Sequence, residues 1–183
     1  VSAGTQHTCA RRANGAVVCW GGNGGGRLGD GTTTQRLVPT PVSGLTDAVE
    51  VAAGNDHSCA RRANGTVVCW GRGDLIPGGA ENQLVPISIE GITSAVDIAV
   101  GRSHTCARMA SGTLVCWGSN SDGQLGDGTY THRVTPSVVS GLTDAVEVSA
   151  GDEHTCARRA SGGVVCWGGN TSRQIGDGTS FAY

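Results

Sequence analysis

The stretch CARRANGAVVCWG at residues 9–21 recurs as CARRANGTVVCWG at 59–71, CARMASGTLVCWG at 106–118 and CARRASGGVVCWG at 156–168. The first cysteines of successive copies lie 50, 47 and 50 residues apart, so the chain is a tandem array of one unit. A fixed period of this length is typical of solenoids and propellers, in which no unit buries its apolar face alone. We therefore expect one stacked body over 1–183 holding about 3.6 repeats. The expected units span approximately 1–47, 48–94, 95–144 and 145–183.

Composition excludes several classes of protein. The 183 residues include 31 glycines and only seven aromatic residues, and charged residues make up 15%. So much glycine raises the entropy lost on folding, which indicates many tight turns. A net charge of −2 gives no general attraction to nucleic acid or to acidic membranes. No apolar run approaches the roughly 20 residues of a membrane span, so we expect no membrane insertion.

Both ends of the chain fall inside the repeat pattern. It begins at Val1 without an initiator Met, and it ends at Tyr183 within a unit. We expect either a processed chain or a piece of a longer one.

The second unit shows how a repeat folds. Three short extended runs are expected over 49–53, 57–62 and 66–70, separated by turn residues. A fourth run over 84–89 contains Pro86, which suits an outer edge strand. Nothing in the unit has helical spacing. The fold class is therefore all-β, a β-propeller of four-stranded blades. A β-helix is the alternative, but its coils are shorter and lack such hairpin turns.

Strand direction sorts the loops onto two faces. One face carries the Gly-Asn-Asp-His and Gly-rich loops, and the other carries the Ala-Asn-Gly hairpin tips. The hairpin face gathers arginines beside acids, which favours local pairing over a basic ring for nucleic acid. These residues are Arg11, Arg12, Arg61, Arg62, Arg108, Arg158 and Arg159, with Asp47, Glu50, Asp97, Asp144 and Glu147.

The cysteine spacing fixes a hairpin register. With the three-residue loop Ala13-Asn14-Gly15, Arg12 lies opposite Ala16, and stepping outward places Cys9 opposite Cys19. A type I turn followed by a bulge needs a left-handed residue at Gly15, and Gly65, Gly112 and Gly162 hold the same place. The cysteines then fall at a non-hydrogen-bonded pair, about 4.5 Å apart at Cα, which suits a disulfide. The expected bridges are Cys9–Cys19, Cys59–Cys69, Cys106–Cys116 and Cys156–Cys166.

A metal site is the alternative use of these cysteines. His7, His57, His104 and His154 each precede a cysteine by two residues, and three soft ligands suit zinc. Each unit lacks an evident fourth ligand, whereas opposed cysteines are already placed for a bridge. We therefore favour disulfides, which imply an extracellular or cell-surface location. The histidines are then expected to be hydrogen-bonded structural residues, because no triad-like serine or carboxylate recurs with them.

The unit resembles the repeat of the regulator of chromosome condensation family. The matching stretches include Val51-Ala52-Ala53-Gly54 through His57 and Val68-Cys69-Trp70-Gly71. In the third unit Trp117-Gly118-Ser119-Asn120, 123–128 and Pro136 continue the match. The resemblance implies a propeller, usually of seven blades, that binds other proteins. The paired cysteines depart from the nuclear family's pattern and suggest an extracellular branch, which argues against nucleotide exchange on a small GTPase.

The Gly-rich loops offer little evident chemistry. They lack the Gly-Lys-Ser/Thr sequence and the following helix of a phosphate loop. Asn120, Asp122 and Asp127 can offer oxygens to Ca²⁺, although the same residue types are common in turns. We expect no cofactor.

The aromatic residues divide into two sets. Trp20, Trp70, Trp117 and Trp167 lie mid-hairpin between blades, which favours core packing over a carbohydrate-stacking ladder. Tyr130, Phe181 and Tyr183 are the candidate interface residues.

The open ends lead to a functional hypothesis. Three units and most of a fourth expose blade faces and strand edges, which copies can cover by head-to-tail docking into a ring or filament. We expect a secreted, non-enzymatic protein acting through protein–protein contact, a structural or self-associating subunit. The alternative is a soluble ligand-binding or inhibitory propeller domain that uses the Gly-rich loop face.

Overall fold

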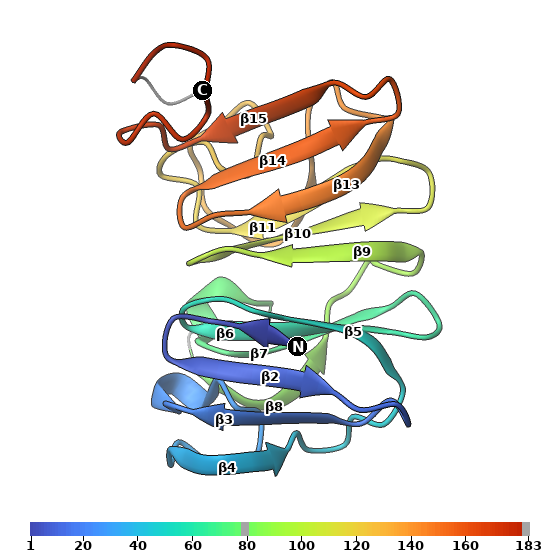
Figure 1. The fold of residues 1–183 in the computed structure, drawn as a ribbon, viewed down its shortest axis with the longest axis vertical. Coiled ribbons are helices and arrows are strands. Elements are labelled where there is room, and N and C mark those ends of the chain that lie inside the picture. The colour runs from blue at the N-terminus through green and yellow to red at the C-terminus, as the bar shows by residue number, and fades with distance from the viewer. Residues whose placement is uncertain (78–80, 181–183) are drawn as a thin grey trace.

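The protein, seen in a computed structural model that describes residues 1–77 and 81–180, is a stack of four antiparallel sheets in chain order (Figure 1). The first sheet holds β1 (Ser2–Ala3), β2 (His7–Arg11), β3 (Val17–Gly21) and β4 (Arg36–Pro41). The second holds β5 (Ala48–Ala53), β6 (His57–Arg62), β7 (Val67–Gly71) and β8 (Gln83–Ser88). The third holds β9 (Ala95–Val100), β10 (His104–Met109), β11 (Leu114–Gly118) and β12 (Arg133–Val138). The fourth has three described strands, β13 (Ala145–Ala150), β14 (His154–Arg159) and β15 (Val164–Gly168).

The strands follow the alternation of the sequence. In the second sheet each strand lies within one residue of its expected position. The difference lies in the Gly-rich loops, where two short 3₁₀ turns form, η1 (Gly24–Gly26) and η2 (Gly73–Leu75). Three residues are too few for a hydrophobic period, so a helical pattern could not reveal them.

The hairpins have the expected register. Arg12 N–H donates to Ala16 O at 2.7 Å, and Cys9 pairs with Cys19 three positions further out. Gly15 has a φ of 84°, as the left-handed loop position requires. The hairpin prediction is therefore confirmed.

The core is divided into layers between consecutive sheets. Leu28 and Trp70, from the first and second units, are fully buried in one such cluster. Ile76 and Trp117 belong to the next cluster, and Leu125 to the third. Because each layer takes side chains from two sheets, no single unit can form this core alone.

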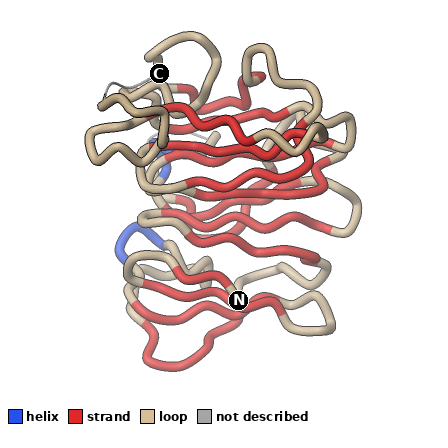
Figure 2. Tube along the Cα trace, turned by 45° about the horizontal axis from the view of Figure 1, so that its top comes forward, coloured by secondary structure: helices blue, strands red, loops and turns tan. Residues whose placement is uncertain are grey.

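The sheets radiate as blades of an incomplete propeller (Figure 2). The all-β propeller prediction is confirmed, and the described sheets do not close into a ring. The first three hairpin tips, at Gly15, Gly65 and Gly112, lie against the connection that leads into the next unit, through bonds such as Ala48 N–H to Gly15 O at 3.0 Å. The Gly-rich loops lie at the opposite face, where Arg27 reaches Asn55 O at 2.8 Å. The stack thus presents two loop faces, an outer edge and two end faces.

Candidate interaction surfaces

Disulfides brace every hairpin. The structure joins all eight cysteines in the four expected pairs, with Cα–Cα distances of 4.0–4.1 Å. These bonds decide between the two uses of the cysteines, because a bridged sulfur is not a zinc ligand. Four disulfides, three of them buried, favour a non-reducing environment. None of the described helices has the length and apolarity needed to cross a membrane.

A histidine links each sheet to the next. His7 Nε2 lies 2.7 Å from Ser58 Oγ, and Ser58 in turn donates to Arg27 O at 3.0 Å. Because the Ser58 hydroxyl has one hydrogen and gives it to a carbonyl, His7 Nε2 must carry the proton and donate it. The same relay joins His104, Thr155 and Gln124 O, each step 2.9 Å long. His7 and His104 are therefore fixed as donors within a hydrogen-bond chain, and His57 Nε2 lies 2.6 Å from Thr105 Oγ1.

Burial holds these imidazoles neutral. Loss of solvation and, to a smaller extent, the Arg27 guanidinium lower the pKa of His7 to about 4, although Asp56 acts in the opposite direction. Burial also lowers the pKa of His57 to about 4 and that of His104 to about 3. Among the described residues, Nδ1 of all three rings has no hydrogen-bond partner. A neutral ring with a protonated Nε2 matches the relay geometry.

Trp70, Trp117 and Trp167 pack backward onto the preceding unit. Trp70 Nε1 donates to Arg27 O at 2.9 Å, and Trp167 Nε1 donates to Gln124 O at 3.0 Å. The indole of Trp70 lies so close to Gly29 that a Cβ there would come within 2.7 Å of the ring. Trp70 and Trp117 are fully buried, whereas Trp20 and Trp167 are half-buried. Trp70, Trp117 and Trp167 thus belong to the core clusters between sheets, whereas Trp20 belongs to none of them. Among the described residues, Trp117 Nε1 has no hydrogen-bond partner.

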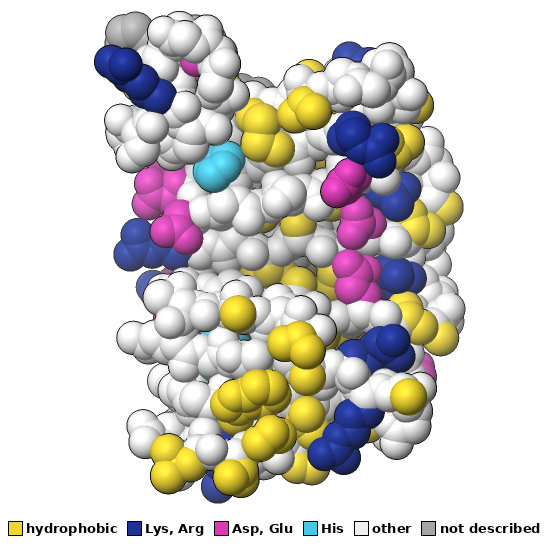
Figure 3. Space-filling view, in the orientation of Figure 1, with side chains coloured by type: hydrophobic (Ala, Val, Ile, Leu, Met, Phe, Trp, Pro, Cys, Tyr) yellow, Lys and Arg dark blue, Asp and Glu magenta, His cyan; other side chains and the backbone are white. Residues whose placement is uncertain are grey.

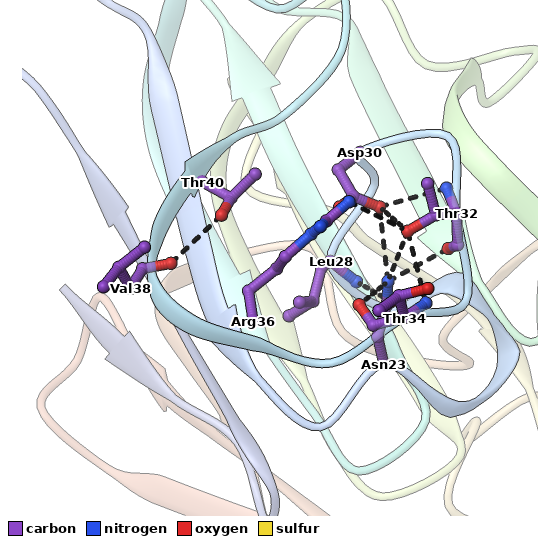
Figure 4. Close-up of polar contacts among 8 residues, drawn as sticks. All are labelled: Asn23, Leu28, Asp30, Thr32, Thr34, Arg36, Val38 and Thr40. Atoms are coloured by element: carbon purple, nitrogen blue, oxygen red, sulfur yellow. Dashed lines mark hydrogen bonds and ion pairs between the residues drawn. The ribbon is translucent and has the colours of Figure 1, made fainter.

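An asparagine organises the Gly-rich loop in three of the units. Asn23 Nδ2 donates to Asp30 Oδ1 and to the carbonyls of Thr32 and Thr34, and Asn23 Oδ1 accepts from Leu28 N–H at 2.9 Å (Figure 4). The buried carboxylate of Asp30 then receives Arg36 Nε at 2.6 Å. Equivalent contacts recur around Asn120 and Asn170. These loops are consequently rigid platforms, a feature that the sequence reading did not anticipate.

The candidate calcium oxygens already have protein partners. Asp127 accepts from Asn120 and Thr129 at Oδ1 and from Arg133 at Oδ2. These bonds lower the pKa of the Asp127 carboxyl despite its burial. Asp122 accepts from Ser121 Oγ at 3.0 Å. Within 1–77 and 81–180, no group of three or more His, Cys, Asp or Glu side chains is placed to hold a metal ion.

The arginine rim is paired with acids along one edge of the stack, where Figure 3 shows dark blue and magenta side chains alternating. The ion pairs are Arg61–Glu50, Arg62–Asp47, Arg108–Asp97, Arg158–Glu147 and Arg159–Asp144. Two of the acids also reach the following sheet, since Glu50 accepts from Ile98 N–H and Asp97 from Val148 N–H. The rim therefore stabilises the junctions between sheets. In the first unit, Arg11 donates to Arg12 O instead.

The two end faces carry apolar groups that are covered at internal junctions. Val17, Val67 and Leu114 are at most 1% exposed, whereas the equivalent Val164 of the last sheet is 65% exposed. At the other end Leu37 is 87% exposed, but this position is only partly covered elsewhere, since its counterpart Leu84 is half-buried and its counterpart Val134 is 50% exposed. Within the described part of the chain, no hydrogen bond reaches Thr8 Oγ1, Trp20 Nε1 or the His154 ring. Each of these groups has a bonded counterpart at an internal junction.

The candidate interface aromatics are only partly visible. Tyr130 is 63% exposed in the third Gly-rich loop. Phe181 and Tyr183 lie outside the described residues. Sequence reasoning missed Ser58, Thr105 and Thr155 as junction residues, although the recurrence of Ser or Thr directly after each histidine could have signalled them.

Comparison with known proteins agrees with this geometry. Models described as "Regulator of chromosome condensation (RCC1) repeat" match residues 14–61 and 111–158, and also 48–75, 95–124 and 145–174. A search of curated proteins finds no match.

Solved structures share the fold. Human WBSCR16 is similar over 98% of this chain and 50% of its own, with 22% identity and a TM-score of 0.88. Prp20p of Saccharomyces cerevisiae matches 93% of this chain and 44% of its own, with 25% identity and a TM-score of 0.80. The receptor kinase CR4 ectodomain of Physcomitrella patens matches 92% and 40%, with 27% identity and a TM-score of 0.59. The chain thus spans half or less of the length of these structures.

Proposed function

The chain belongs to the regulator of chromosome condensation (RCC1) repeat family, and on that premise we propose that it is a non-enzymatic, extracellular protein-binding module that associates head to tail with copies of itself. Propellers of this family are typically binding or exchange-factor proteins. The observation that carries the proposal is that the two end faces bear the unmatched halves of the junction that joins sheets inside the chain.

The matching groups are specific. At the first and third internal junctions a histidine donates to the Ser or Thr of the next sheet, and a tryptophan N–H reaches back to a loop carbonyl. On the last sheet His154 and Gln174 O occupy the equivalent places, and on the first sheet Thr8 and Trp20 do. Docking one copy's first sheet on another's last would pair His154 with Thr8 and Gln174 O with Trp20.

Apolar burial supplies the driving force. Such docking would cover Val164, which is 65% exposed, as internal sheets cover the equivalent Val17, Val67 and Leu114. Each fully buried aliphatic side chain contributes about 1.5–3 kcal/mol. The interface is heterologous, so it closes into a ring or extends as a filament. Two copies would supply eight sheets, within the range of four to eight blades found in closed propellers.

Sedimentation velocity tests the proposal. The wild-type chain is expected to show a mass that rises with concentration above its 18.4 kDa monomer. Val164→Asp places a charge in the docking face and is expected to return the chain to a monomer. Val138→Asp is the matched control, because Val138 is 60% exposed on the outer strand of an internal sheet. A wild-type chain that stays monomeric at millimolar concentration contradicts self-association.

The absence of catalysis is proposed from the state of the histidines. Ser58 gives its hydroxyl hydrogen to a backbone carbonyl, so it is not an activated nucleophile. The low histidine pKa values leave these rings poorly suited as general bases near neutral pH. A substrate turnover abolished by His57→Ala would contradict this part of the proposal.

The four disulfides support the extracellular part of the proposal. A chain isolated from its source without reductant is expected to be four pairs of hydrogen atoms lighter than the fully reduced chain. Free thiols in the isolated chain would contradict an oxidising location.

Named partners of related structures do not transfer to this chain. Prp20p has described binding properties toward Gsp1p and histones. For this chain we propose only the partner class, which is protein, including its own copies.

A second candidate function uses the Gly-rich loop face. A polar cleft of about 160 Å³ lies there, lined by Arg72, Arg102, Asp152 and Glu153 among others. Its mixed charges and rigid loops suit a soluble binding or inhibitory domain with a polar ligand. A ligand held there is expected to lose affinity in Arg102→Glu, while Val164→Asp leaves its binding unchanged.

A further inference from the structure

On the Gly-rich loop face, a guanidinium closes the junction between the first and second units. Arg27 lies four residues after the loop asparagine Asn23 and reaches across to the second unit. Its Nη1 donates to Asn55 O at 2.8 Å, and its Nη2 lies 3.1 Å from Asp56 Oδ1. A cation from one unit therefore lies between a main-chain carbonyl and a carboxylate of the next.

The junction between the third and fourth units has the same acceptors but a shorter side chain in place of the arginine. Gln124 holds the position of Arg27, but its Oε1 turns back to accept from Asp122 N–H within its own loop at 3.0 Å. Asp152 O and the Glu153 carboxylate are the counterparts of the two acceptors, because Gly-x-x-His recurs in both units. Both residues line an open cleft of about 160 Å³ at this junction.

The acceptors of the cleft have capacity for a second cation. Arg102 Nη1 lies 3.5 Å from Glu153 Oε1, and the two side chains are 55% and 45% exposed. An ion pair of this length and exposure is weak. Asp152 O accepts from Arg102 N–H at 3.2 Å, and a carbonyl oxygen has a second lone pair. The position that corresponds to the Arg27 guanidinium can therefore still receive a cationic nitrogen.

The cleft also presents hydrogen-bond donors. Gln124 lines it and is only 2% exposed, and within the described chain its Nε2 has no hydrogen-bond partner. Ser103 and Ser119 line the cleft as well, and their hydroxyls make no hydrogen bond to any described residue. A buried amide donor is costly to leave unpaired. A carboxylate suits such donors, because it only accepts hydrogen bonds and does so at both oxygens.

The charges of the lining disfavour a simple anion. At neutral pH, Asp56, Asp152 and Glu153 contribute three negative charges, and Arg72 and Arg102 contribute two positive ones. A carboxylate without a cation would add to this negative excess, and like charges repel. A ligand that pairs with the donors must therefore carry a cationic group as well.

The size of the cleft limits the ligand further. Its volume of about 160 Å³ is below the range of about 300–1,000 Å³ that drug-sized ligands occupy. The two charges of the ligand must therefore lie close together. An α-amino acid with a small side chain has this property, because its ammonium and carboxylate are bonded to the same carbon.

Resting on the second candidate function, in which this cleft binds a polar ligand, we propose that the ligand is a free α-amino acid with a small side chain. Its ammonium lies between Asp152 O and the Glu153 carboxylate, as the Arg27 guanidinium lies between their counterparts. Its carboxylate accepts from Gln124 Nε2 and from Arg102. A residue at a chain end keeps only one of the two charges, so a protein terminus does not replace the free amino acid.

An NMR titration of the full chain with L-alanine tests the proposal. Amide shifts are expected at Gln124 and Glu153, with saturation at one site per chain. N-acetylalanine lacks the ammonium and alaninamide lacks the carboxylate, so each is expected to bind about tenfold more weakly. These two probes imitate the last and the first residue of a protein, so they also separate a free amino acid from a chain end.

Gln124→Glu isolates the buried amide. The variant keeps an oxygen toward Asp122 N–H but removes the donor, and it is expected to weaken alanine binding about tenfold. Gln174→Glu is the matched control. Gln174 Oε1 accepts from Ser172 N–H at 2.9 Å in the same way, but Gln174 does not line the cleft. The control is expected to bind alanine as the wild type does.

Glu153→Gln isolates the ammonium contact. The preference for alanine over N-acetylalanine is expected to disappear in this variant, because the charge pair is then absent with either ligand. No alanine binding, equal affinity of the wild type for alanine and N-acetylalanine, or equal binding of alanine to the wild type and Gln124→Glu would overturn the amino-acid ligand. Arg102→Glu tests separately whether the cleft holds another polar ligand, and Val164→Asp tests self-association. Each proposal can therefore fail without the others.

Discussion

The buried histidines make the stability of the fold sensitive to pH. His7, His57 and His104 have pKa values of about 4, about 4 and about 3 in the folded chain, against about 6.5 for an unfolded one. Between these values the unfolded state binds protons that the folded state does not. Stability is therefore complete above about pH 6.5 and is lost as the pH falls toward 4.

Urea unfolding at several pH values measures this loss. Each histidine is expected to contribute a slope of about 1.4 kcal/mol per pH unit near pH 5. His104→Gln retains an N–H donor toward Thr155 but does not titrate, so its slope is expected to be smaller by that amount. An unchanged slope in the variant would show that His104 is already protonated in the folded chain.

At this scale the sequence predicted the cysteine partners but not the histidine partners. Cys9 and Cys19 share one hairpin, so counting from Gly15 was enough to pair them. Ser58 is 51 residues from His7, and their contact depends on how two sheets stack. Stacking is a tertiary property that the local pattern of one unit does not contain.

At the scale of the element, the hairpin glycines offer a matched pair. Gly112 and Gly162 hold the same loop position, with φ values of 85° and 88°. A Cβ on Gly112 would lie 2.7 Å from Thr143 O, whereas nothing lies within 4 Å of one on Gly162. The hairpin that contains Gly112 is covered by the connection into the next sheet, whereas the hairpin that contains Gly162 is not.

Alanine substitutions should separate strain from collision. Gly162→Ala is expected to cost about 1–2 kcal/mol, because only the left-handed backbone is strained. Gly112→Ala adds a collision with backbone and is expected to cost a further 1–3 kcal/mol or so. Denaturant unfolding with the disulfides intact measures both. Equal losses would mean that the connection at Thr143 yields without cost.

The elements themselves were largely readable from the sequence. Alternation and turn glycines placed strands such as β6 and β7 to within one residue, because both signals are local. The Gly-rich loops were not readable in the same way. Asn23 organises its loop by donating to the carbonyls of Thr32 and Thr34, which lie nine and eleven residues away. The amino-acid composition of the loop is that of an ordinary turn, so it does not reveal these contacts.

For the whole molecule, stability is expected to vary along the stack. Repeat arrays gain stability from nearest-neighbour interfaces, and the second and third sheets each have two neighbours in the described chain. Among the described residues, the last sheet has one neighbour, and the outer edge of β15 pairs with no strand. Arg159 N–H donates to Gly163 O, so alternation along the hairpin points the Cys166 amide away from β14.

Hydrogen exchange tests that gradient at one pair of residues. Cys116 lies opposite Ser137 of β12, whereas Cys166 has no described strand beyond it. The Cys166 amide is expected to exchange roughly a thousandfold faster than that of Cys116, equivalent to about 4 kcal/mol of local protection. Equal protection of the two amides would mean that the β15 edge is already paired in solution.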